Sequence, residues 1–325
     1  MPVAWMERHQ VALFVAAIAV GAAVGLAIPD AGAAVEPAIT PALGALLYVT
    51  FLGVPFGRLA AAFRDRRFLA TVLVLNFVAL PVVVFGLSRF VSDDRALLVG
   101  VLLVLLTPCV DYVVVFTGLA GGAREKLLTA TPLLMIAQVA LLPVYLWLMA
   151  GEDVVGAFDV RPFVEAFALL IVLPLALAVA TQLLARRARW ARAWTAAAAG
   201  AMVPLMMAVL AVVVGSQIAA VGGALARILA VVPIFVAFAV LAFAAGFVGS
   251  RGLDAPSRRA VVFSGVTRNS LVVLPLALAL PSTFALAPLV VVTQTLVELV
   301  VMVAMVWVVP RVVRGSPGRG QRERG

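Results

Sequence analysis

The sequence predicts an all-α polytopic membrane protein, and three observations carry this prediction: the composition, the length of the apolar runs and the placement of the basic residues. Of the 325 residues, 65% are hydrophobic and only 12% are charged, whereas about 25% are charged in soluble domains. Apolar runs of about 20 residues recur along the chain, and each is long enough to cross a bilayer as a helix. This composition excludes an ordinary soluble enzyme.

Ten apolar segments are expected to cross the membrane, and the basic residues orient them. Segments on the cytoplasmic side of membrane proteins retain Lys and Arg. With the N-terminus inside and the spans alternating, 19 of the 24 basic residues fall on the inner side and 4 on the outer side, while Arg268 falls within a span. We therefore expect a bacterial-type plasma (inner) membrane protein with both termini in the cytoplasm. The expected spans are 9–28, 38–57, 69–91, 96–120, 127–149, 163–184, 195–217, 226–249, 257–280 and 284–309.

An internal repeat suggests that the ten spans form two five-helix units. Pro132 and Gln138 recur as Pro288 and Gln294, with the same spacing and 156 residues further along the chain. Because five is an odd number of spans, the second unit is inverted in the membrane, as in many secondary carriers. The expected organisation is a first repeat over 1–150, an outside connector over 151–162, an inverted second repeat over 163–310 and a basic, disordered cytoplasmic tail over 311–325.

The fourth and ninth spans contain residues that interrupt a helix. Pro108 in the fourth span cannot continue the helical hydrogen-bond ladder, and Gly265, Asn269, Ser270 and Pro275 favour an interruption in the ninth. Broken helices leave backbone N–H and C=O groups that bind solutes and ions. Two interrupted helices at corresponding places in two halves indicate a binding site near the middle of the membrane.

Three charged residues, Asp111, Arg268 and Glu298, fall inside expected spans. Each charge costs about 2.5–3.5 kcal/mol on insertion, so each requires a partner or a wet cavity. Asp111 and Arg268 are either a structural ion pair between two helices or a pair that lines the transport site, where a proton or the substrate competes for Asp111. Glu298 either forms a hydrogen bond as a neutral group, for example with Gln294 four residues earlier, or exchanges a proton.

The chain offers little material for other chemistry. Its one cysteine, Cys109, excludes an intramolecular disulfide and a Cys-cluster metal site, and its one histidine, His9, excludes His-ligated zinc and His-based triads. An integral-membrane enzyme is therefore disfavoured. A sensor or scaffold is disfavoured for another reason, because it would not require paired broken helices with buried charges at corresponding places. The basic residues lie in short clusters between apolar runs, which disfavours nucleic-acid binding. We expect no cofactor, no metal site and no obligatory protein partner, and we expect a small solute and membrane lipid as partners.

Cys109 directly follows Pro108 and precedes Asp111 by two positions. Its thiol is either a small packing group, which is the usual role of a free cysteine in a span, or a contact for a soft, thiophilic solute. Amides elsewhere in the spans are expected to form hydrogen bonds between helices. These amides are Asn76, Gln138, Gln182 and Gln217.

Two segments carry a family resemblance. Cys109–Gly122 has a Cys, a run of apolar residues and then Leu-Ala-Gly-Gly, and Leu296–Met302 reads Leu-Val-Glu-Leu-Val-Val-Met. Together with ten spans, an inverted repeat and interrupted fourth and ninth helices, they resemble the bile acid:sodium symporter superfamily, and within it the arsenite efflux permeases. That resemblance implies export of arsenite driven by the proton gradient. It also implies that Cys109 contacts the metalloid and that Glu298 is the last-span glutamate.

The resemblance has departures that bear on the coupling ion. The arsenite permeases carry a ninth-span glutamate a few residues after an Asn, where this chain has Val272, and Arg268 precedes the Asn instead. In the sodium-coupled branch, the fourth-span Ser-Asn ligands fall on Val113 and Val114, and the ninth-span Glu and Gln fall on Ser264 and Arg268. A cation site that has lost its carboxylate and gained an arginine is a poor sodium site, so sodium coupling is disfavoured.

The favoured function is a proton-coupled secondary transporter that exports arsenite, and also antimonite, by alternating access, with the crossing helices and their neighbours moving against the other helices. The expected substrate contacts are Cys109, Asp111, Arg268, Asn269 and Ser270, with Asp111 also exchanging protons, as Glu298 does. The alternative is a carrier of a small organic anion. In that case Arg268, which is always charged, and the N-termini of the broken helices bind the carboxylate of the substrate.

Overall fold

The computed structural model describes residues 5–6, 9–28, 41–42, 44–53, 64–110, 112–151, 168–221 and 225–314, and within these ranges the chain forms helices and no strands. This confirms the all-helical class, while the ten-helix inverted repeat stays a prediction. The expected connector after Gly151, the expected tail from residue 315 onward and Asp111 lie outside the described residues. Five described helices are long and apolar enough to cross a membrane, namely Arg66–Val91, Arg124–Ala150, Arg189–Val212, Ala226–Gly249 and Ser282–Val312.

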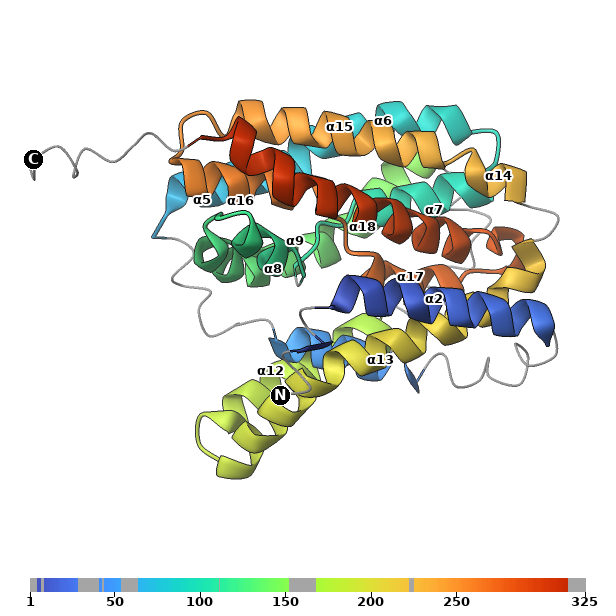
Figure 1. Cartoon of the computed structure of the whole chain (residues 1–325), viewed down its shortest axis with the longest axis horizontal. Helices are drawn as coiled ribbons and strands as arrows, with labels where there is room; N and C mark the ends of the chain where they lie inside the picture. Colours follow the sequence, from blue (N-terminus) through green and yellow to red (C-terminus); the bar gives the residue numbers. More distant parts are fainter. Residues whose placement is uncertain are drawn as a thin grey trace, which may run out of the picture.

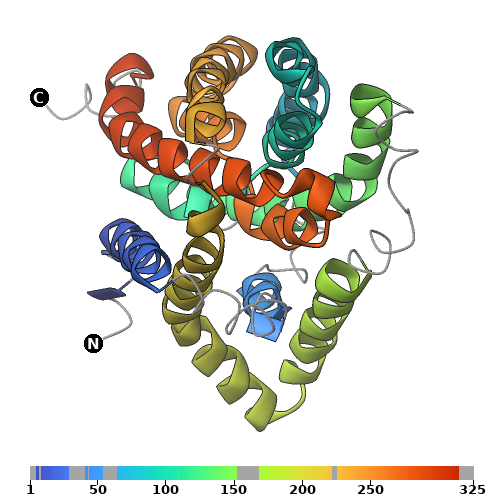
Figure 2. The same ribbon diagram turned by 90° about the vertical axis from the view of Figure 1, so that its right-hand side faces the viewer.

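The helices form two groups, which lie one above the other in Figure 2. The larger group contains α5 (Arg66–Val74), η2 (Leu75–Ala79), α6 (Leu80–Ser88), η3 (Arg89–Val91), α7 (Arg95–Leu105), α8 (Tyr112–Leu119), α9 (Arg124–Ala150), α14 (Leu225–Leu229), α15 (Val232–Gly249), α16 (Ala255–Val266), α17 (Ser270–Leu278), η5 (Ser282–Phe284) and α18 (Ala287–Val312). The smaller group contains α2 (Gln10–Ala27), the helix Gly44–Gly53, η4 (Ala168–Val172), α12 (Leu173–Ala185) and α13 (Arg189–Val221) (Figure 1).

Hydrogen bonds from side chains connect three helices of the smaller group. Trp194 Nε1 donates to the hydroxyl of Tyr48 (3.0 Å), and that hydroxyl lies 3.0 Å from the hydroxyl of Thr181. Gln182 Nε2 donates to the carbonyl of Leu52 (3.0 Å), so the hydrogen bond between helices expected at Gln182 is present. These bonds connect the helix Gly44–Gly53 to α12 and α13. They suit a membrane interior, where polar side chains find partners on neighbouring helices.

A proline causes a π-turn in the larger group, namely the π-helical segment η2 (Leu75–Ala79). Pro81 has no N–H, so the carbonyl of Phe77 loses its usual helical donor. The hydroxyl of Tyr145 on α9 donates to this carbonyl instead, and the chain widens into the π-helix η2. Asn76 lies in this turn, fully buried, and its Nδ2 donates to Ser264 Oγ on α16 (3.0 Å). The π-turn therefore places an amide side chain in the interior of the larger group.

Close approach of α7 and α18 depends on Gly100. A Cβ at this position would lie 2.7 Å from Val290 Cβ and 3.1 Å from the backbone of Ala287. Helices in membranes commonly pack through such small residues, because no side chain then separates the backbones. Both helices carry residues of the crossing described below, so this contact helps to fix the site.

We expect Gly100→Ala to lower the stability of the protein by about 1–3 kcal/mol, because the added methyl group overpacks the contact with Val290. Gly86→Ala is the matched control. A Cβ at Gly86 meets nothing within 4 Å, and alanine is the better helix former by about 0.5–1 kcal/mol. Thermal unfolding of the purified variants in one detergent compares them. Equal melting temperatures for both variants would contradict the close packing of α7 on α18.

Candidate functional site

Two interrupted helices cross in the middle of the larger group. The chain unwinds between α7 and α8, and again between α16 and α17. The two unwound segments pair through an isolated antiparallel bridge between Pro108 and Arg268. Two backbone hydrogen bonds flank this bridge: Cys109 N–H donates to Thr267 O (3.2 Å), and Asn269 N–H donates to Thr107 O (2.8 Å). The fourth and ninth expected spans are thus interrupted, and the interruptions contact each other.

The interruption of α16 redirects two backbone donors. In an uninterrupted helix, the N–H groups of Arg268 and Asn269 would bond to the carbonyls of Ser264 and Gly265. The N–H of Asn269 is used in the crossing, and the N–H of Arg268 donates to Oε2 of Glu298 (2.8 Å). Two carbonyls at the end of α16 are therefore left without their helical donors.

The side chain of Arg268 supplies the missing donors. Its Nη2 donates to the carbonyls of Ser264 (3.0 Å) and Gly265 (2.6 Å). Its Nη1 donates to the carbonyl of Leu105 (3.3 Å) at the end of α7, whose helical donor is also lost to the crossing. Nη2 also donates to Oδ1 of Asn76 (2.8 Å). This fully buried guanidinium thus joins α7, α16 and η2.

Aromatic packing completes the surroundings of the guanidinium. The ring of Phe238 on α15 lies 5.2 Å from the guanidinium carbon of Arg268, within the range of a cation–π contact.

Asn76, which accepts from Arg268 and donates to Ser264, was expected only to connect helices and not to line the site. In the sequence, the sign that Asn76 could line the site was its amide side chain within an apolar span that also contains Pro81.

Glu298 lies on α18 beside the crossing and is 3% exposed. Its Oε2 accepts from the backbone of Arg268 and from Nε2 of Gln294, so the expected contact between Glu298 and Gln294 is present. A small cavity of about 10 Å³ adjoins these two side chains and is also lined by residues of α15 and the end of α16. It has room for about one water molecule.

Three of the expected substrate contacts, Cys109, Asn269 and Ser270, lie in or beside the two unwound segments. Cys109 is fully buried. Asn269 caps α17, because its Oδ1 accepts from the N–H of Val272 (3.3 Å). Among the described residues, Asn269 Nδ2 and Ser270 Oγ are buried and have no hydrogen-bond partner. Such atoms cost about 1–3 kcal/mol each unless a solute or water binds them.

The second interruption does not coincide with the glycine and proline expected to cause it. It spans Thr267 to Asn269, whereas Gly265 lies inside α16 and position 275, a proline, lies inside α17. A Cβ at Gly265 would lie 2.9 Å from Leu75 Cδ2. This glycine therefore permits close packing on η2, and the hydrogen bonds of the crossing determine where the helix ends. Pro108 does lie in the first interruption, at the bridge.

The Leu-Ala-Gly-Gly sequence at residues 119–122 lies at the end of α8 and has a structural role there. Gly121 has φ +64°, and the N–H of Gly122 donates to the carbonyl of Thr117 (2.8 Å), which is the pattern of a glycine-terminated helix. Nη1 of Arg259 on α16 donates to the carbonyls of Ala120 and Gly121, both at 3.2 Å. A positive charge at a helix C-terminus is favourable. This sequence therefore ends α8 and anchors it to α16.

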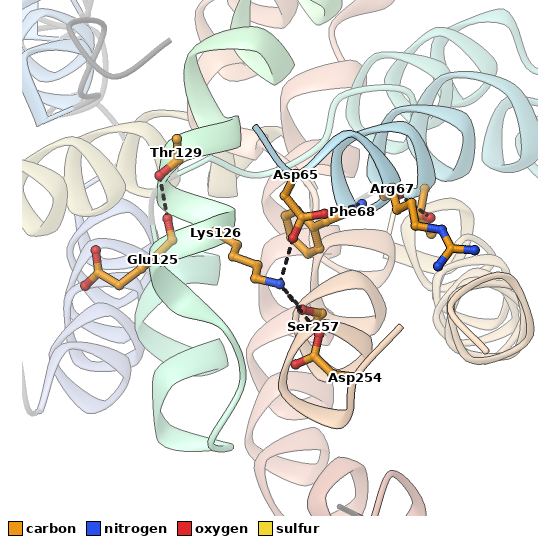
Figure 3. A network of polar contacts seen from close by, with 9 residues as sticks. Asp65, Arg67, Phe68, Glu125, Lys126, Thr129, Asp254 and Ser257 are labelled. Carbon is orange, nitrogen blue, oxygen red and sulfur yellow. Dashed lines mark hydrogen bonds and ion pairs between the residues drawn. The ribbon is translucent and has the colours of Figure 1, made fainter. Parts of the chain in front are cut away.

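An ion-pair network connects the N-terminal ends of α5, α9 and α16 (Figure 3). Nζ of Lys126 lies 2.7 Å from a carboxylate oxygen of Asp65 and 3.5 Å from one of Asp254, and it donates to the hydroxyl of Ser257 (2.9 Å). Hydrogen bonds from Lys126 and from the N–H of Phe68 lower the pKa of Asp65. Burial raises the pKa of Asp254, but the hydrogen bonds from Ser257 and the charge of Lys126 outweigh it, so this pKa is also lowered.

We expect the stabilisation from Lys126 to disappear in acid. A carboxyl group whose pKa is lowered by folding stabilises the fold above its ordinary value of 3.8, and this contribution is lost as the pH falls through the lowered value. Lys126→Gln should therefore melt below the parent at neutral pH and approach it in acid. Arg124→Gln is the matched control, because the ion pair of Arg124 with Glu125 lies on an exposed surface and contributes little to stability. A melting-temperature difference that stays constant from neutral pH into acid would contradict this account.

Comparison with known proteins identifies the family. A model described as the Sodium Bile acid symporter family matches residues 40–223, which is more than half of the chain and includes the first interruption but not the second. No match was found among curated proteins. Members of this family are transporters and not enzymes. The chain therefore belongs to the sodium bile acid symporter family, and it is a multi-pass membrane protein that transports a small solute.

Proposed function

We propose that this transporter exports arsenite, and also antimonite, in exchange for protons. The observation that carries the proposal is the place of Cys109, next to the bridge between the two broken helices. The other unwound segment contributes Asn269 Nδ2, and α17 begins with Ser270, whose Oγ, like Asn269 Nδ2, has no hydrogen-bond partner within the described part of the chain. A soft thiol and two uncompensated polar atoms therefore come from the same crossing.

The chemistry of arsenite suits these groups. Near neutral pH arsenite is an uncharged trihydroxide whose hydroxyl groups both donate and accept hydrogen bonds. Asn269 offers an amide donor and Ser270 a hydroxyl, so both can bind hydroxyl groups. The thiol of Cys109 is a soft ligand and prefers a soft element such as trivalent arsenic. A sulfur–arsenic bond forms when the thiol proton and one hydroxyl group leave as water, and water reverses this step on release.

The transport cycle in this proposal is alternating access by two inverted five-helix repeats. The crossing belongs to the larger helix group, and the smaller group has its own internal hydrogen bonds. Each group therefore keeps its internal contacts when one moves against the other. The basic residues favour both termini in the cytoplasm, and in this proposal the solute is taken up from that side and released on the other.

Proton coupling is assigned to Asp111 and Glu298. Glu298 is buried and accepts two hydrogen bonds at one carboxylate oxygen, and a cavity with room for about one water adjoins it. In this proposal the carboxylate of Glu298, beside the backbone of Arg268, gains or loses a proton when the solute binds at the crossing or leaves it. Asp111 adjoins the unwound segment in sequence, two residues after Cys109.

The organic-anion alternative is less well supported by this geometry. It assigns the substrate carboxylate to Arg268, but four protein oxygens already accept from the guanidinium, and these belong to Leu105, Asn76, Ser264 and Gly265. An anion at the crossing would therefore bind at the N-terminal ends of α8 and α17. Such binding would not depend on the thiol of Cys109, so a cysteine substitution separates the two functions.

We expect Cys109→Ser to abolish arsenite and antimonite tolerance in an efflux-deficient bacterial host, because the hydroxyl does not replace a soft ligand. Val110→Ala is the matched control, since Val110 is buried in the same unwound segment and lacks a thiol. Membrane levels of each variant are measured by immunoblotting. If the parent, present in the membrane, confers no tolerance, arsenite export is excluded. If Cys109→Ser keeps full tolerance, the thiol is excluded from the path.

We expect Glu298→Gln to transport without stimulation by a pH gradient. Glutamine keeps an acceptor oxygen for the N–H of Arg268, so the crossing stays formed, but the side chain no longer exchanges a proton. The measurement is uptake of radioactive arsenite by everted membrane vesicles, with and without an imposed gradient. Glu125→Gln, at an exposed site, serves as control. Unchanged stimulation in Glu298→Gln would assign proton coupling elsewhere.

A further inference from the structure

We propose that the guanidinium of Arg268 is a tethered cation that fills an oxygen-lined cation site, so that the carrier needs no sodium ion from solution. The family is named for sodium, and in this chain the oxygen atoms of the crossing already surround a positive charge. The proposal rests on the transport function but not on the identity of the solute.

The oxygen atoms around the guanidinium have the character of cation ligands. Three of them, Asn76 Oδ1, Ser264 O and Gly265 O, surround a single nitrogen, Nη2, at 2.8, 3.0 and 2.6 Å. Carriers commonly coordinate sodium with unwound backbone carbonyls and the C-terminal ends of half-helices. Here the carbonyls belong to the end of α16, and a fourth, from Leu105, lies at the end of α7 and accepts from Nη1. The negative ends of two helix dipoles also favour a positive charge at this place.

A sodium ion does not fit among these groups while Arg268 is present. The guanidinium occupies the centre of the oxygen cluster, and the ring of Phe238 covers it at 5.2 Å. A second positive charge a few ångströms away would be repelled in a buried environment. In addition, Ser264 provides a hydroxyl and a carbonyl but no carboxylate, and the carboxylate of Glu298 beside the crossing already accepts from the backbone of Arg268 and from Gln294. The positive charge that the cluster requires is therefore part of the chain.

A tethered cation differs from a bound ion in that it neither dissociates nor titrates. Arginine keeps its proton over the whole physiological range, so the cluster is occupied in every state of the cycle. The crossing is then stable without an ion gradient. A gradient that drives transport must act on another group, and this agrees with the assignment of coupling to carboxylates.

The test is thermal unfolding of the purified full-length protein in detergent, in sodium chloride and in choline chloride of equal ionic strength. We expect the parent to melt at the same temperature in both salts. Arg268→Ala empties the oxygen cluster, so it should melt lower than the parent in choline and recover part of the loss in sodium. At a sodium concentration of about ten times the dissociation constant, this rise amounts to about 2–4 °C. Arg268→Lys keeps a tethered cation and should be indifferent to sodium.

Two further measurements make the result specific. Adding Asn76→Ala to Arg268→Ala removes one oxygen of the cluster and should abolish the response to sodium. Binding of radioactive sodium to the parent should show no saturable component. Saturable binding by the parent, or a parent stabilised by sodium over choline, would overturn the proposal, and so would a folded Arg268→Ala variant that ignores sodium. If Arg268→Ala does not fold in either salt, the parent measurements alone decide. None of these readouts involves arsenite, so a failure of the proposed substrate leaves this test intact.

Discussion

The guanidinium of Arg268 holds the crossing of the two broken helices together, because it supplies the hydrogen-bond donors that the interruptions remove. Three carbonyls, those of Leu105, Ser264 and Gly265, lose their helical donors, two of them to backbone bonds across the crossing and one to Glu298, and all three accept from this one side chain. Each unsatisfied carbonyl would cost about 1–3 kcal/mol. Arginine suits the task, since it carries five N–H donors and a permanent charge. Neutral amides would satisfy fewer of these oxygens.

The rest of the larger helix group maintains this arrangement. Gly100 lets α7 approach α18, which carries Glu298, and Gly265 lets α16 approach η2, which carries Asn76. The π-turn at η2 arises from Pro81, whose missing N–H is compensated by Tyr145. At one end of the group, Lys126 connects α5, α9 and α16. The unwound segments are thus supported by close helix packing on several sides, so a rigid-body movement of the whole group is compatible with an intact crossing.

The sequence was sufficient to predict the membrane class and the two interruptions, because hydrophobic length, a proline and charges within apolar runs act locally. It was not sufficient to predict the partners of Arg268. Those depend on which carbonyls lose their donors when two distant segments cross, and the contribution of Asn76 depends on a π-turn. The same limit explains Gly265, which was expected to break the ninth helix: its lack of a side chain serves packing on Leu75. The expected partner Asp111 lies outside the described residues.

The direction of the Arg268 side chain also bears on the type of solute. A charged arginine exposed at a binding site favours an anion, which argues against an uncharged arsenic trihydroxide. In this structure the guanidinium is turned toward protein oxygens and the ring of Phe238, so helix ends and amide dipoles contribute to stabilising its charge. Among the described residues, two neutral groups at the crossing, Asn269 Nδ2 and Ser270 Oγ, are buried without a hydrogen-bond partner. A neutral, hydroxyl-rich solute satisfies them without adding a net charge to the interior of the membrane, where such a charge would be costly.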